Sequence, residues 1–283
     1  MSMTPRQRLH TVLRGELPDC VPAAPDVSNM IPARLTGKPF WRLYLYNDPP
    51  IWEAYIAAAH RLGFDALMDG YFPLSFPDER PPEDNPWQPF IVLRTGDRIV
   101  VQRSRIEGGK RIWQPKVGVF YVADSPTGGV PPEKIGLPPE PETFEPLEGV
   151  REVDTGPEGL KRVMALMGDQ GLVGVNLAST VAFRNERDIY AYYDHPELHE
   201  RWAAERIEAV ERRFANIMSM DVRPDFLCVG GSGTLVFQTE EMFRRVAFPA
   251  VKRGIELAAA AGIPTHVHSC GPEARLVEIF AEE

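Results

Sequence analysis

The residues with the clearest chemical potential are two histidines and a cysteine within residues 265–271, which read Thr-His-Val-His-Ser-Cys-Gly. The side chains of a strand alternate between its two faces, so His266, His268 and Cys270 are expected to project to one side. Imidazole nitrogen and thiolate sulfur are zinc ligands, and these three residues are therefore the predicted metal ligands. The alternative is structural, with His266 an interior polar residue and Cys270 a small buried apolar one.

A glycine-rich segment, residues 230–234, follows the apolar run 226–229 and reads Gly-Gly-Ser-Gly-Thr. Its backbone N–H groups are suited to holding an anion or a substrate carboxylate. The segment lacks the lysine of a P-loop and the spacing of a dinucleotide fingerprint, so we interpret Ser232 as a substrate contact rather than as part of a phosphate cradle. Cys228, inside the apolar run, is interpreted as a core residue.

Four further polar residues follow predicted strands and complete the candidate site. Asp69 comes at the end of an apolar run and is the predicted catalytic residue. Asp26, Asn29 and Asn176 follow other runs in the same way and are predicted to bind substrate. Sites of α/β folds are built at the carboxyl ends of the strands, which favours this interpretation. Taken singly, each of these residues is also suited to a turn or a helix cap.

Short apolar runs alternate with helical patterns over most of the chain, which predicts parallel strands connected by helices. The predicted strands are residues 21–24, 64–68, 172–177, 226–229 and 265–268. Five such units are enough for an open flavodoxin-like sheet, and they are also five-eighths of a (β/α)₈ barrel. The pattern alone leaves both folds open.

Residues 73–146 interrupt this pattern and hold 14 of the 28 prolines of the chain. The stretch otherwise contains short alternating runs, and Gly96-Asp97 and Gly108-Gly109 fall where hairpin turns are needed. We therefore predict a proline-rich insertion of antiparallel β-hairpins outside the parallel sheet.

Composition narrows the classes of function. The chain has 31 Lys and Arg against 40 Asp and Glu, a net charge of −9, and no basic stripe to neutralise a phosphate backbone, so nucleic acid is not an expected partner. The three cysteines are too few and too scattered for a disulfide framework. The sequence shows neither a secretory signal nor an apolar stretch long enough for a membrane span, so we expect a soluble, cytoplasmic protein.

The first residues of the chain resemble the opening of the uroporphyrinogen decarboxylase superfamily. Residues 4–8 read Thr-Pro-Arg-Gln-Arg, and residues 13–22 read Leu-Arg-Gly-Glu-Leu-Pro-Asp-Cys-Val-Pro, similar to the family phrase in which a helix leads into the first barrel strand. Several segments between residues 194 and 271 also resemble that superfamily. The resemblance implies a (β/α)₈ TIM barrel, expected to be incomplete at its C-terminus because the chain ends 13 residues after Cys270.

One branch of this superfamily, the methylcobamide:thiol methyltransferases, carries a His-x-Cys motif as zinc ligands, and His268 and Cys270 match it. The resemblance implies a zinc cofactor, an acceptor thiol bound as thiolate, and methylcobamide as the methyl donor. A separate corrinoid carrier protein would present the donor over the barrel mouth to the small-molecule acceptor. If the acceptor is a pterin, zinc is not required and the His-Cys pair is residual. The family's second cysteine ligand has no counterpart here.

Two alternatives to methyl transfer stay open. The true decarboxylases use no metal; they hold substrate carboxylates with an arginine pair just after the first strand and use an aspartate after the second. This chain has the single Arg34 within residues 26–39, while Asp69 is an imperfect match to the aspartate. The other alternative is a non-catalytic barrel fragment.

Overall fold

The computed structural model describes residues 2–79, 83–183, 185–271 and 273–282. The chain divides into two compact units, each with its own sheet. The parallel unit comprises Met1–Val21, Leu67–Glu79 and Thr155–Glu283, and the antiparallel unit comprises Pro22–Ala66 and Arg80–Asp154. The fold is therefore α/β, with a parallel four-stranded half-barrel sheet and a separate antiparallel five-stranded sheet.

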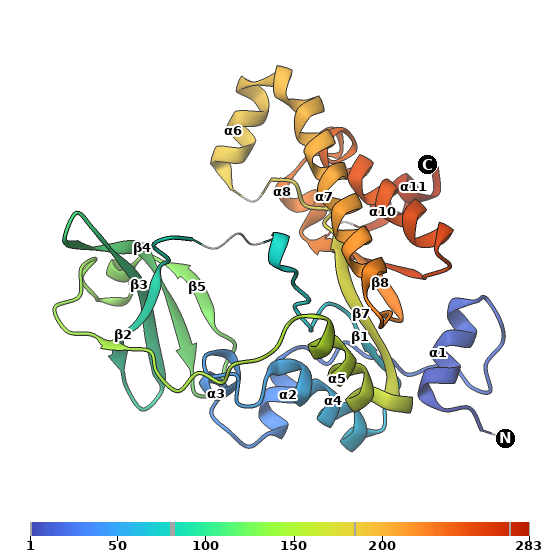
Figure 1. Cartoon of the computed structure of the whole chain (residues 1–283), viewed down its shortest axis with the longest axis horizontal. Coiled ribbons are helices and arrows are strands. Elements are labelled where there is room, and N and C mark those ends of the chain that lie inside the picture. The colour runs from blue at the N-terminus through green and yellow to red at the C-terminus, as the bar shows by residue number, and fades with distance from the viewer. Residues whose placement is uncertain (1, 80–82, 184, 272, 283) are drawn as a thin grey trace. The chain divides into compact units, whose positions relative to one another are not determined.

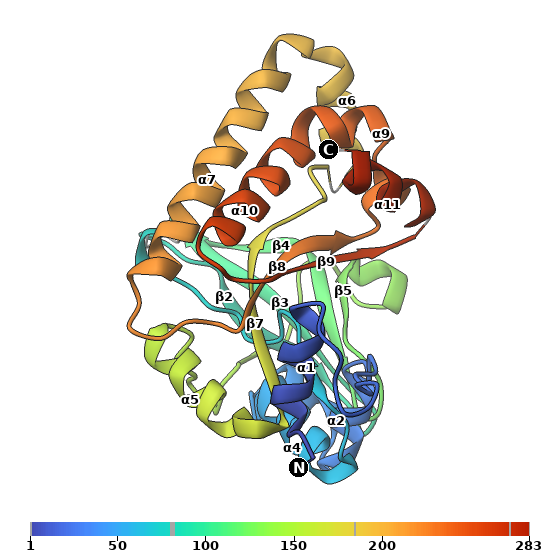
Figure 2. The ribbon, with the colours of Figure 1, turned by 90° about the vertical axis from the view of Figure 1, so that its right-hand side faces the viewer.

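The parallel sheet has the strand order β1-β7-β8-β9; β1, β7 and β8 are labelled in Figure 1, and β9 is labelled in Figure 2. The strands are β1 (Ala66–Met68), β7 (Gly171–Ala178), β8 (Phe226–Ser232) and β9 (Thr265–Cys270). β7 and β8 are mostly apolar and buried over most of their length, as is typical of parallel strands. β9 is more accessible and carries the polar residues singled out above.

Two helices, α7 (His199–Ser219) and α10 (Phe248–Ala260), pack against each other and against the sheet, and Figure 2 shows them side by side. Gly254 makes this close packing possible, because a Cβ there would lie 3.2 Å from the Leu177 side chain and 3.4 Å from that of Val210. The other helices and helical turns of this unit are α1 (Pro5–Leu13), α5 (Pro157–Met167), α6 (Glu186–Asp194), α8 (Thr234–Phe237), α9 (Glu240–Met242), α11 (Glu273–Glu282), a π-helical turn (Phe243–Ala247) and short 3₁₀ turns (Pro77–Glu79, Gly168–Gln170, Pro196–Leu198).

The antiparallel sheet has the order β5-β4-β3-β2-β6. Gly108 and Gly109 join β3 to β4 with φ angles of 55° and 78°, the conformation that a two-residue hairpin turn demands. The elements of this unit are β2 (Gln88–Arg94), β3 (Arg98–Glu107), β4 (Lys110–Tyr121), β5 (Thr127–Val130), β6 (Glu145–Pro146), α2 (Met30–Leu35), α3 (Phe40–Tyr44), α4 (Ile51–Leu62) and a 3₁₀ turn (Pro132–Ile135).

Apolar side chains cover both faces of the antiparallel sheet. One face packs against the segment around α3, through the cluster Leu45, Tyr46, Ile91, Ile99 and Val101. The other face packs against the segment that contains the 3₁₀ turn, through Val100, Val117, Val119, Ile135 and Leu137. The alternation of neighbouring residues between the two clusters is the period of two expected for a strand buried on both sides.

The prediction of a strand at residues 21–24 is wrong. Val21 is 87% exposed, and Pro22 has no N–H to contribute to a strand ladder. The Ala23 N–H instead donates to the Asp65 carboxylate at 2.7 Å. The parallel sheet therefore has four strands where five were predicted.

The predicted antiparallel strands are present, and all of them lie within residues 73–146. The compact unit that contains them also takes in Pro22–Ala66, which the sequence pattern had placed with the parallel sheet. Over the described part of the chain, no helix combines the length and the apolar character that crossing a membrane requires.

Candidate functional site

Six polar side chains gather on β8 and β9 and just after β1, and the group extends to the carboxyl ends of β8 and β9. We call them the carboxyl-end cluster: Asp69, Cys228, Ser232, His266, His268 and Cys270. The parallel register of β8 and β9 sets their levels, because Cys228 pairs with His266 and Ser232 pairs with Cys270. The proximal level contains Asp69, Cys228 and His266. The distal level, further along the strands, contains Ser232, His268 and Cys270.

The distal level is a close triangle of donor atoms. Cys270 Sγ lies 3.3 Å from His268 Nε2 and 3.7 Å from Ser232 Oγ, and the latter two atoms are 3.5 Å apart. All three side chains are accessible to solvent. A small molecule can therefore reach a thiol, an imidazole and a hydroxyl at one place.

The local sequence explains how β9 presents these groups. Gly230 lets β9 run close to β8, since a Cβ there would lie 2.2 Å from the His268 carbonyl oxygen. Ser269 faces the other way and donates to Thr234 Oγ1 at 2.9 Å, and that hydroxyl lies 2.6 Å from Thr180 Oγ1. These hydroxyls fix the rear of the strand and leave the distal level on the opposite face, as alternation predicts.

The proximal level is a carboxylate flanked by an imidazole and a thiol. His266 Nδ1 lies 2.7 Å from Asp69 Oδ2, and the Cys228 thiol also hydrogen-bonds to the Asp69 carboxylate. The Phe226 ring stands edge-on to the His266 imidazole, with 6.1 Å between ring centroids. Because β1 and β9 are the two outer strands of the sheet, the Asp69–His266 pair spans the sheet from one edge to the other.

The electrostatics of the proximal level favour the carboxylate form of Asp69 and raise the proton affinity of His266. Burial opposes a charge on Asp69, but hydrogen bonds from His266 and Cys228 outweigh it and lower the pKa of the carboxyl. The hydrogen bond to Asp69 is the main reason that the pKa of His266 is raised. Burial, followed by the charge of Asp69, raises the pKa of the Cys228 thiol and keeps it protonated. The pair can therefore accept a proton on His266 and stabilise it.

The remaining predicted residue of the parallel unit, Asn176, lies next to the turn that follows Asp69. A Cβ on Gly70 would come 2.8 Å from Asn176 Oδ1, and Gly70 has a φ of 67° that favours glycine. Asn176 is exposed, and its main-chain carbonyl oxygen accepts a hydrogen bond from Arg213 Nε at 2.5 Å. Asn176 on β7 pairs with Cys228 on β8 and therefore stands level with the proximal residues.

The other two predicted substrate contacts, Asp26 and Asn29, lie in the antiparallel unit. The Asp26 carboxylate accepts a hydrogen bond from the Ser28 N–H at 2.8 Å, and the Ser28 hydroxyl accepts one from the Met30 N–H at 3.1 Å. Asn29 precedes α2 without forming a side-chain cap. Asp26 is engaged in the turn that its alternative interpretation describes.

The distal level can be compared with what zinc requires. His268 and Cys270 supply a nitrogen and a sulfur 3.3 Å apart, a separation that suits two ligands each about 2.0–2.3 Å from one ion. The third predicted ligand, His266, lies instead against Asp69. Among the residues that the structure describes, no three His, Cys, Asp or Glu side chains stand close enough to share an ion. Two residues therefore fit zinc, and the Ser232 hydroxyl is the nearest further donor.

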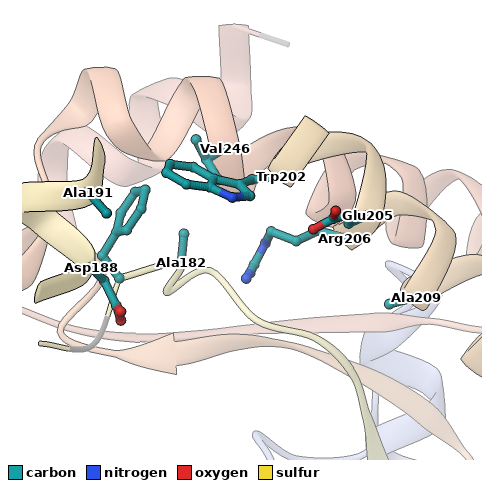
Figure 3. Close-up of a pocket in the computed structure, with 9 residues that line it drawn as sticks. Ala182, Asp188, Ala191, Trp202, Glu205, Arg206, Ala209 and Val246 are labelled. Carbon is teal, nitrogen blue, oxygen red and sulfur yellow. The ribbon is translucent and has the colours of Figure 1, made fainter. Parts of the chain in front are cut away.

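A cavity of about 440 Å³ in the parallel unit contains none of the residues predicted from sequence (Figure 3). Trp202 and Arg206, four residues apart on α7, line it opposite the Ala182 segment. Arg206 donates to the carbonyl oxygens of Ser179 and Val181 at 2.8 and 3.4 Å, so the loop after β7 is held by α7. The helical spacing of Trp202 and Arg206 was the only signal in the sequence for this surface.

Comparisons with known protein families, with curated proteins and with solved structures find no match to this chain.

Proposed function

We propose that this chain is a methyltransferase built on a (β/α)₈-type barrel, moving a methyl group from a methylcobamide to a thiol acceptor. The observation that supports it best is the 3.3 Å separation of Cys270 Sγ and His268 Nε2 at the carboxyl ends of parallel strands. Those ends are where barrel enzymes place their catalytic groups. The two residues are also the ones that carry the resemblance to the thiol methyltransferases.

In this proposal His268 and Cys270 would hold a zinc ion, and the chemistry that the ion would supply is a lowered pKa for the acceptor thiol. The released proton goes to His266, which is half-exposed at the adjoining level and is held by Asp69 through Nδ1. An imidazolium at that position is stabilised by the carboxylate beside it. Asp69 is thus assigned the role of orienting and charging the proton acceptor.

The methyl transfer itself balances without any further reagent. The acceptor sulfur forms a bond to the methyl carbon as the cobalt–carbon bond breaks, and the electron pair of that bond stays on cobalt. A corrinoid is much larger than the accessible triangle of the distal level, so we assign its presentation to a separate carrier protein. The chain's own groups bind the acceptor and remove its proton.

The proposal is tested by metal analysis and by an activity assay. The chain should bind about one zinc weakly, in the presence of free zinc, because two protein ligands leave the rest of the coordination to water. In zinc-containing buffer, methylcobalamin with a panel of thiols should yield methyl thioethers detectable by mass spectrometry. Cys270→Ser should lose most of the metal and the activity, since it removes the thiolate. Cys20→Ser is the matched control, because Cys20 is also an exposed free cysteine. Zinc and activity unchanged in Cys270→Ser would refute the proposal.

A second candidate function, cofactor-free decarboxylation, is favoured by the Asp69–His266 pair. A carboxylate joined to an imidazole at 2.7 Å can deliver a proton to the carbanion that loss of carbon dioxide leaves. Decarboxylation of uroporphyrinogen that persists after metal chelation and is lost in Asp69→Asn, without any methyl transfer, would place this function first. Activity in neither assay would favour a non-catalytic barrel.

A further inference from the structure

The antiparallel unit contains a cavity of about 600 Å³ that plays no part in the proposed function. It opens over the face of the sheet formed by β3, β4 and β5, beside the end of α3. This volume lies within the range of pockets that bind small organic molecules. The residues that line it are Tyr44, Leu45, Asn47, Pro89, Val101, Arg103, Gln114, Lys116, Val117, Gly118, Phe120, Gly128, Gly129, Leu147 and Val150.

The charge of this lining is unusual for the chain. It contains Arg103 and Lys116 but no Asp or Glu, in a protein whose net charge is −9. Within the described residues, neither Arg103 nor Lys116 makes a hydrogen bond or an ion pair. By contrast, Arg94 and Arg42 in the same unit are paired with carboxylates. Two cations without anionic partners therefore face one cavity.

An irregularity in the sheet brings these cations together. The register of β3 and β4 shifts between Gln102 and Ser104, so that the residues of β4 opposite Arg103 form a bulge that includes Lys116. The buried Gln102 side chain pins this bulge by donating from Nε2 to the Gln114 carbonyl oxygen at 2.8 Å. Bulges of this kind re-aim side chains and are over-represented next to functional sites.

The rest of the lining provides an apolar surface on one side of the cavity and unfilled space beside the glycines of β5. Leu45, Val101 and Phe120 belong to or pack against the core cluster beside α3, so they offer a fixed apolar surface. Gly128 and Gly129 lie on β5, and a Cβ added at Gly128 would meet no atom within 4 Å. The cavity thus combines a cationic side, an apolar side and unfilled space.

We propose that this cavity binds an organic carboxylate with an apolar body. The carboxylate lies between Arg103 and Lys116, where charge-assisted hydrogen bonds replace those to water. The apolar body lies against Leu45, Val101 and Phe120, where it removes apolar surface from water. A neutral molecule of the same shape lacks the first interaction, and inorganic phosphate lacks the second.

Isothermal titration calorimetry of the full chain with octanoate, octanol and inorganic phosphate tests this proposal. Octanoate should bind at least about tenfold more tightly than either comparison compound, because only octanoate makes both interactions. Arg103→Ala and Lys116→Ala should each weaken octanoate binding by roughly fivefold, a modest factor because both cations are solvent-exposed. The double variant should weaken binding further.

Lys110→Ala is the matched control, since Lys110 is an exposed lysine on β4 outside the cavity lining. It should leave octanoate binding unchanged. Thermal unfolding of each variant checks that the sheet is intact, which is expected because neither cation bonds to the rest of the described chain. Equal binding of octanol and octanoate, no binding of octanoate, or an effect of Lys110→Ala equal to that of the cavity variants would overturn the proposal. The result does not depend on zinc or on methyl transfer.

Discussion

Replacing Asp225 tests how the sheet that carries the cluster is anchored. The Asp225 side chain is only 5% exposed and precedes β8 directly. Its carboxylate accepts hydrogen bonds from both terminal nitrogens of Arg6 on α1, the Nη1 bond being 3.0 Å long. It also accepts one from the Val173 N–H at 2.9 Å. One carboxylate therefore joins α1 to β7 and to the start of β8.

The loss of stability expected for Asp225→Ala is the sum of the losses at the two groups that bind its carboxylate, the Val173 N–H and the Arg6 guanidinium. The Val173 N–H would be left buried without an acceptor, at a cost of about 1–3 kcal/mol. Arg6 keeps a hydrogen bond to the Gly171 carbonyl oxygen at 3.2 Å and is 28% exposed. Because water can solvate its charge, losing the ion pair with Asp225 should cost only about 1 kcal/mol of stability. We therefore expect Asp225→Ala to lower the free energy of unfolding by about 3 kcal/mol.

Urea unfolding at neutral pH, followed by far-ultraviolet circular dichroism, measures this loss. Asp225→Asn keeps an oxygen for the Val173 N–H and should cost less, about 1–2 kcal/mol. Asp221→Ala is the control, because Asp221 is an exposed aspartate 3.6 Å from Lys161, and it should change stability by less than about 0.5 kcal/mol. If Asp225→Ala and Asp221→Ala shift the midpoint equally, the assignment of Asp225 as an anchor is wrong.

Three further substitutions test other parts of the parallel unit. Gly254→Leu should cost roughly 1–3 kcal/mol in thermal unfolding, because even a Cβ there would lie 3.2 Å from the Leu177 side chain; full stability would contradict that packing. Gly230→Ala should be destabilising by a similar amount, roughly 1–3 kcal/mol, since its Cβ would collide with the β9 backbone, and a melting temperature like that of the wild type would show that β9 can move away. Hydrogen bonds from Arg275, then from Arg244, lower the pKa of Glu240 to about 2, so its stabilisation is present above the ordinary pKa of 4.5 and is lost as the pH falls toward 2. Glu240→Gln should flatten the fall in melting temperature over that interval, and an unchanged pH profile would count against the ion pair.

The part of the site that could be predicted from sequence is the part that one strand determines. Alternation along β9 correctly puts His268 and Cys270 on one face and Ser269 on the other, because the period of a strand is a local property. The turn at Gly108-Gly109 was equally predictable, since only residues tolerant of positive φ suit a two-residue hairpin.

Contacts between strands that are distant in the sequence could not be predicted from the sequence pattern. His266 was grouped with its neighbours on β9, yet its partner is Asp69, 197 residues away along the chain. That pairing depends on the order of the strands and on the curvature that brings the outer strands of the sheet together. The prediction of a strand at residues 21–24 was wrong for a different reason. An apolar run that contains proline lacks a backbone N–H donor, and this run also lacks the burial of a central strand.

The motif at the start of the chain, residues 4–22, makes structural contacts and contributes no residue to the candidate site. Thr4 and Gln7 form a capping box at the start of α1, and Arg8 binds Asp19 of the phrase that follows. Arg6 reaches Asp225 at the amino end of β8. The contact with Asp225 lies at the amino end of β8, away from the distal level at its carboxyl end. The opening motif therefore has a structural role in this chain, and the proposal of methyl transfer depends on the carboxyl-end cluster instead.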